Sequence, residues 1–101
     1  MVATTLLVDG MLSGTGVRDA INGGYIEPRD LELSADLCAG LAAWVSEYGL
    51  LHMHGYVDAQ AIERLDQEGL ALAMMLAAER QDHVVGYYSD ALLRRFDLPH
   101  A

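Results

Sequence analysis

The chain has 101 residues, of which 52% are hydrophobic, and this is enough for the core of one domain spanning residues 1–101. Fifteen acidic residues face six basic ones, all arginine, so the formal net charge is −9. A field of that sign repels phosphate backbones and anionic lipid headgroups. We therefore expect binding to neither nucleic acid nor membranes.

The sequence shows no pattern of a membrane-spanning helix, a signal peptide or an intramolecular disulfide. Its longest uncharged runs are about ten residues long, whereas a membrane-spanning helix needs about twenty. The first residues lack the basic segment of a signal peptide, so we expect a cytoplasmic protein. Cys38 is the only cysteine, which excludes an intramolecular disulfide and a thiolate zinc cage and favours a small core residue.

The first third of the chain predicts one strand and a long loop. Residues 4–8 are β-branched and apolar and precede Asp9-Gly10, which is typical of a strand followed by a turn. Five glycines interrupt residues 10–28, so we expect mostly loop, with one short helical turn at 17–21.

The first predicted helix begins after Ser34, which can accept a hydrogen bond from the amides of the first turn. Four large residues then follow a three-or-four spacing and define one buried face: Leu37, Leu41, Trp44 and Tyr48. Gly49 is a predicted stop for this helix. Residues 50–56 either extend the helix or form a packed connection, and the pattern does not decide between them.

A second helix is predicted from the capping residue Asp58 to about Glu79, with an apolar stripe that includes Gly69. Glycine on such a stripe indicates close approach to a neighbour, which we expect to be the first helix. Residues 83–88 predict a second strand, and Ser89 can cap a short final helix over residues 90–96.

These elements predict an α+β domain, with the helix pair packed on a small sheet of the N-terminal and C-terminal strands and a short C-terminal helix after them. Two strands alone are marginally stable. Either a further strand lies within residues 10–28, or a second copy of the chain completes the sheet and a homodimer forms.

Three segments form a recurrent arrangement: residues 25–34 (YIEPRDLELS), 65–73 (LDQEGLALA) and 84–88 (VVGYY). Together they resemble small bacterial α+β proteins without an assigned function, over about two-thirds of this chain. Some of those proteins resemble immunity partners of secreted toxins. The resemblance implies an α+β fold. For the immunity-like members it also implies a toxin as the protein partner, which the immunity protein inhibits.

The carboxylates concentrate in two groups near the predicted helix starts, and both are candidate partner-binding residues. The first acidic group is Glu27, Asp30, Glu32 and Asp36, and the second acidic group is Asp58, Glu63, Asp66 and Glu68. Some of these residues complement a helix dipole. The others form a solvated face, or the two groups merge into one electronegative patch.

Two other candidate sites depend on other residues, and only the first of them remains an alternative to partner binding. His52, His54 and His83 could hold a divalent metal together with carboxylates, although surface histidines are the more usual explanation. The glycines at 10–16 follow a strand as in phosphate-binding loops, but the required Gly-Lys-Ser/Thr ending is missing.

We find no nucleophile or acid/base pair in the sequence, so an enzyme is the least favoured class, and we expect no catalytic residues and no cofactor. The sequence favours an acidic interaction module, an immunity or inhibitor protein that binds a basic, nuclease-like partner. The metal-binding protein is the first alternative, and a small dimeric enzyme is the second.

Overall fold

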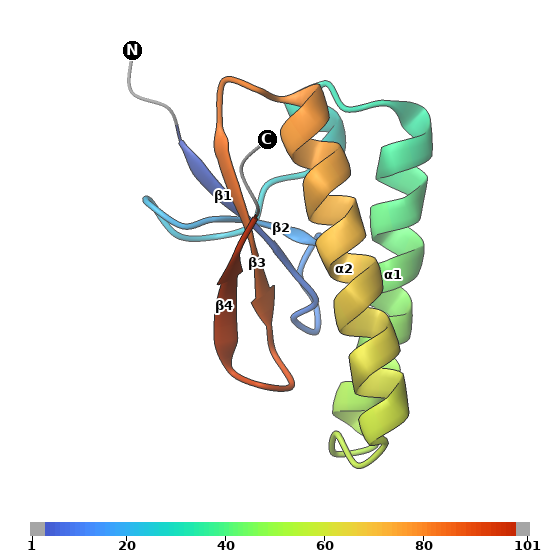
Figure 1. The fold of residues 1–101 in the computed structure, drawn as a ribbon. Helices are drawn as coiled ribbons and strands as arrows, with labels where there is room; N and C mark the ends of the chain where they lie inside the picture. Colours follow the sequence, from blue (N-terminus) through green and yellow to red (C-terminus); the bar gives the residue numbers. More distant parts are fainter. Residues whose placement is uncertain (1–3, 99–101) are drawn as a thin grey trace.

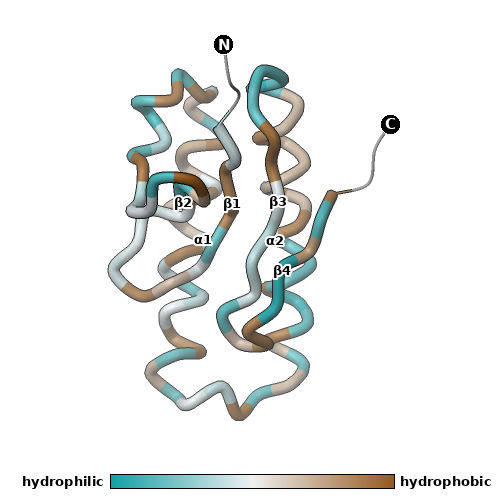
Figure 2. The backbone as a smooth tube through the Cα atoms, turned by 90° about the vertical axis from the view of Figure 1, so that its left-hand side faces the viewer, coloured by the Kyte–Doolittle hydropathy of each residue, from teal (hydrophilic) through white to brown (hydrophobic). Residues whose placement is uncertain are grey.

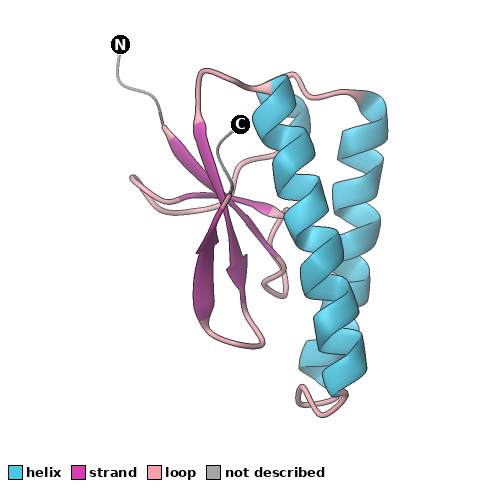
Figure 3. Ribbon diagram, in the orientation of Figure 1, coloured by secondary structure: helices cyan, strands magenta, loops and turns pink. Residues whose placement is uncertain are grey.

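The computed structural model describes residues 4–98, which form two layers, a mixed sheet and a helix pair (Figures 1 and 3). This confirms the α+β class. In chain order the elements are β1 (Thr5–Asp9), β2 (Val17–Asp19), the 3-10 helix η1 (Pro28–Leu31), α1 (Ala35–Met53), α2 (Ala59–Glu79), β3 (Val84–Ser89) and β4 (Arg94–Asp97). No helix within this part of the chain is long and apolar enough to cross a bilayer.

The strand order in the sheet is β2-β1-β3-β4. The central strands β1 and β3 are parallel, with Leu6 opposite Val85, and the two helices form the connection between them. Both outer strands pair antiparallel with their neighbours. The further strand expected within residues 10–28 is therefore confirmed as β2.

Residues 17–19 are extended, so the helical turn predicted at 17–21 is wrong. Val17 pairs with Val8 of β1 and buries its side chain completely. A β-branched residue that completes the sheet core gains more from this pairing than from one isolated helical turn.

The short C-terminal helix predicted over residues 90–96 is also wrong. Residues 90–93 form a turn with Leu93 in the left-handed region (φ 54°), and β4 returns along β3 with Phe96 opposite Tyr87. The Ser89 hydroxyl does accept a hydrogen bond from the Leu92 amide (3.1 Å), as a helix cap would. Here the same local bond tightens a hairpin turn.

The start of α1 is as predicted, but its end is not. The Ser34 hydroxyl accepts from the Leu37 amide (3.2 Å), and the four predicted stripe residues are all buried. The predicted stop at Gly49 is wrong, because the helix continues to Met53 and Gly49 packs within reach of the Leu12 side chain. After α1 the backbone enters the left-handed region at Gly55 and Tyr56.

Helix α2 has the predicted cap and length, with the Asp58 carboxylate accepting from the Ala61 amide at 3.1 Å. Gly69 marks a close approach to two neighbours. A Cβ atom there would lie 2.6 Å from Cζ2 of Trp44 on α1, and it would also overlap the Tyr87 ring on β3. The predicted contact with the first helix is thus present, and the sheet contributes a second one.

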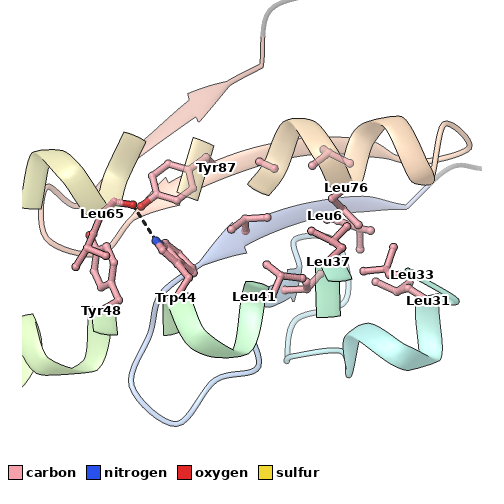
Figure 4. Close-up of a cluster of buried hydrophobic side chains, with 14 of the residues drawn as sticks. Leu6, Leu31, Leu33, Leu37, Leu41, Trp44, Tyr48, Leu65, Leu76 and Tyr87 are labelled. Atoms are coloured by element: carbon pink, nitrogen blue, oxygen red, sulfur yellow. Dashed lines mark hydrogen bonds between the residues drawn. The ribbon is translucent and has the colours of Figure 1, made fainter. Parts of the chain in front are cut away.

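The core lies between the helix pair and one face of the sheet (Figure 4). In Figure 2 polar residues recur between apolar ones along α2, which is typical of a helix that buries one face, whereas α1 carries few polar residues. At the centre, the Trp44 indole donates to the Leu65 carbonyl (2.8 Å) and packs edge-on against Tyr87. This bond joins α1 to α2 where both contact the sheet.

Candidate functional site

A cluster of buried carboxyl and hydroxyl groups lies at the carboxyl ends of β1 and β3. Asp9 is the last residue of β1, and Ser89 and Asp90 stand at the corresponding end of β3. Because the two strands are parallel neighbours, these residues meet at one edge of the sheet. Asp66 of α2 and Tyr48 of α1 complete the cluster from the helix layer.

Asp66 is held by three hydroxyl donors. Tyr48 donates to Oδ1 at 2.8 Å, Tyr87 donates to the same oxygen, and Ser89 donates to Oδ2 at 2.7 Å. Charge-assisted bonds of this kind compensate a buried carboxylate for its lost hydration. Burial raises the pKa of Tyr48 to about 12 and that of Tyr87 further, so both phenols stay protonated as donors.

Asp66 is therefore an interior residue, only 7% exposed, and it does not belong to a partner-binding surface. Asp66 directly follows the buried Leu65 in α2, and its side chain lies on the buried side of this helix. Of the eight carboxylates singled out in the sequence, this is the one that the fold takes away from solvent.

Asp9 and Asp90 form a carboxyl pair. Asp9 is fully buried, accepts from the Met11 amide at Oδ1 (2.8 Å) and places Oδ2 3.3 Å from Nε of Arg18. Burial, followed by the hydrogen bond with Asp9 and the charge of that residue, raises the pKa of Asp90 to about 8. Asp90 is thus mostly protonated at neutral pH, and the Arg18 guanidinium lies beside the Asp9 carboxyl group.

Tyr25 closes this part of the cluster. Its hydroxyl is buried without a hydrogen-bond partner, and burial together with the nearby charge of Asp9 raises its pKa to about 12. Gly10, directly after Asp9, packs closely against Tyr48, since a Cβ atom at this position would lie 2.5 Å from Cγ of Tyr48. The glycine after β1 is thus needed for packing against the cluster.

The cluster has the shifted pKa values that are common at functional sites, but its main groups are closed to a ligand. Asp9 and Ser89 have no exposed surface. These two residues are therefore not accessible to a substrate in this structure, whereas Asp66 lines a groove between α2 and β4. The arrangement joins the ends of β1 and β3 to both helices, and we interpret it as a structural centre.

The first acidic group lies where η1 leads into α1, and Glu27 stands two residues after Tyr25 of the cluster. All four of its side chains are exposed. Glu27 is the one member of the group that lines a groove of about 420 Å³, together with Arg29, Cys38 and Ala42. Within residues 4–98, none of the four carboxylates has an ion-pair partner within 4.0 Å.

The second acidic group does not join the first. The helices are antiparallel, with Glu79 at the end of α2 bonded to Ser34 before α1, and so the two helix starts lie at opposite ends of the pair (Figure 1). A helix of this length separates its ends by roughly 30 Å. Glu68 pairs with Arg64, Asp58 caps α2, and Glu63 is exposed.

The three histidines also lie apart. His52 and His54 are exposed at the end of α1, where His52 contacts the Tyr56 hydroxyl. His83 follows α2 at the other end of the helix pair and lies against Arg80 and the Thr4 carbonyl. No group of three His, Cys, Asp or Glu residues within 4–98 is arranged to hold a metal ion.

Most arginines form an ion pair within residues 4–98. Arg64 pairs with Glu47 and Glu68, while the ion pairs of the others are Arg18 with Asp9, Arg80 with Asp82 and Arg95 with Asp97. The acidic excess therefore persists at the surface, and the first acidic group is its clearest concentration.

Comparison of this chain with protein-family models, with curated proteins and with solved structures finds no match. Its function is inferred from the geometry alone.

Proposed function

We propose that this protein is an acidic interaction module that binds a basic protein partner through the first acidic group. The observation that carries the proposal is that Glu27, Asp30, Glu32 and Asp36 are all exposed and lack ion-pair partners within the described chain, with Glu27 lining an open groove. Four such carboxylates attract a cationic surface and speed its approach.

The groove gives this surface a shape as well as a charge. Apolar side chains of α1 line it together with Glu27 and Arg29. A long basic side chain suits such a site, because its methylene stem can cover apolar surface while its charged end reaches a carboxylate. Arginine is favoured over lysine, since its planar group can bond a carboxylate through two donors.

A nuclease-like toxin is the partner class that best fits these features. A protein that holds phosphate backbones presents a positively charged surface, and an acidic module can cover that surface and block it. The proposed role is thus that of an immunity or inhibitor protein. We do not propose a histidine metal site, because His52 and His83 lie at opposite ends of the helix pair.

The proposal is tested by capturing partners from the source organism with the full chain as bait and identifying them by mass spectrometry. The test variant is Asp30→Asn with Glu32→Gln. The matched control is Glu63→Gln with Glu68→Gln, which removes the same charge from α2. We expect a basic partner that the wild type and the control retain and that the test variant binds at least ten-fold more weakly.

The association rate of that partner should fall steeply as salt is raised from 0.05 to 0.5 M. Equal binding of both variants would move the site away from the first acidic group. An association rate that does not depend on salt would exclude charge as the basis of recognition.

A further inference from the structure

A second surface, independent of the first acidic group, lies along β4. Among residues 4–98, this strand is at the edge of the sheet and has β3 as its neighbour on one side only (Figure 1). Its other side presents backbone N–H and C=O groups, which are a template for another strand. The opposite edge differs, because β2 is three residues long and Tyr25 bridges to its Arg18.

The surface next to this edge is apolar. A groove of about 280 Å³ runs between α2 and β4, and its walls include Ile62, Leu70, Leu92 and Phe96. The adjoining turn exposes Leu92 and Leu93 by 55% and 76%. An apolar groove beside an unpaired strand edge is typical of an interface between protein chains.

The sequence of β4 is complementary to itself. Residues 94–97 read Arg-Arg-Phe-Asp, so antiparallel pairing centred on Phe96 sets Arg95 of one copy opposite Asp97 of the other. Within one chain these two side chains already share a face of the sheet, with Nε and Oδ1 3.5 Å apart. Opposite charges in directly facing positions stabilise a strand pair.

We propose that β4 is a self-association edge, on which a second copy of this chain pairs antiparallel about Phe96. The two sheets then become one continuous sheet, and a two-fold axis at Phe96 brings the two α2–β4 grooves together. Each copy covers the apolar surface of the other. The first acidic groups, at the far side of the fold, stay free for a partner.

The net charge of each copy opposes dimerisation. The salt dependence of dimerisation should therefore differ from that of partner binding. Each copy carries −9, and the narrow dimensions of the molecule are 25 and 24 Å. The centres of two copies side by side are then about three Debye lengths apart at 0.15 M salt, but less than one apart at 0.01 M. Self-association should therefore strengthen with salt, whereas binding of a basic partner should weaken.

The test is sedimentation equilibrium of the full chain between 0.01 and 0.5 M salt, with two charge variants. Arg95→Asp sets like charges opposite each other in a homodimer, and so does Asp97→Arg. We expect each variant alone to dimerise at least ten-fold more weakly than the wild type. A mixture of the two restores both opposite-charge pairs and should form a heterodimer of wild-type affinity.

Circular dichroism and Trp44 fluorescence establish that both variants are folded. A wild type that stays monomeric at all salt concentrations would overturn the proposal. So would variants that dimerise like the wild type, or a mixture that forms no heterodimer. Asp30→Asn with Glu32→Gln serves as the control, since it should leave the dimer intact while weakening the proposed partner.

Discussion

Replacing Asp90 by asparagine should stabilise the protein and remove part of its pH dependence. In the folded chain the pKa of Asp90 is about 8, against an ordinary value of 3.8. Between these two pH values the folded state binds a proton that the unfolded state has released. The stabilising contribution is therefore complete below pH 4 and is lost as the pH rises through 8.

The size of the effect follows from this difference. A rise from 3.8 to about 8 is roughly four units, and at about 1.4 kcal/mol per unit the upper limit is about 6 kcal/mol. Asp90 is only partly buried, so solvent screens much of this, and we expect about 2 kcal/mol. Asparagine keeps the shape and remains neutral at every pH, so Asp90→Asn avoids the loss.

Urea unfolding followed by the fluorescence of Trp44 measures this, because that side chain is the only tryptophan and is buried in the core. The free energy of unfolding of Asp90→Asn should exceed that of the wild type by about 2 kcal/mol at pH 8, and the gap should narrow toward pH 5. Asp30→Asn, at an exposed carboxylate, is the control. A gap that does not change with pH would refute the raised pKa of Asp90.

Three substitutions test the packing around the same centre. Gly69→Ala should destabilise the fold by about 1 to 3 kcal/mol, since the new methyl overlaps two aromatic rings, and an unchanged melting temperature would contradict that packing. Ser34→Ala should cost about 1 to 2 kcal/mol in urea unfolding, because it removes a helix cap and the bond to Glu79. A double-mutant cycle with Glu79→Gln should show that the two residues are coupled, and strict additivity would argue against their bond. Tyr87→Phe should cost about 2 kcal/mol by removing one donor from the buried Asp66 carboxylate, and full stability on thermal unfolding would show that the other donors suffice.

Local chemistry made the two helices predictable. Ser34 and Asp58 act as caps through bonds to amides three residues later, and such bonds depend only on neighbouring sequence. The turn after Ser89 shows the limit of this reasoning. Its hydroxyl makes the bond of a helix cap, yet the chain turns into a hairpin because residues 94–97 gain a partner in β3.

The buried centre could not be predicted, because it depends on which strands become neighbours. Asp9 and Asp90 each follow an apolar strand in the sequence, and only the parallel pairing of β1 with β3 brings them together. The same holds for the acidic groups. Their distances along the chain were known, but their separation in space was set by the antiparallel packing of the helices.

The parallel pairing of β1 with β3 also bears on how the chain folds. Thr5 lies opposite Val84, so this contact closes a loop that contains both helices. Contacts so far apart in sequence form slowly, whereas the helix hairpin depends on nearby residues and can form first. During synthesis, β1 is made early and lacks its parallel partner until β3 has been made. A folding pathway of this kind predicts that the helix pair assembles first and that the central strands join last.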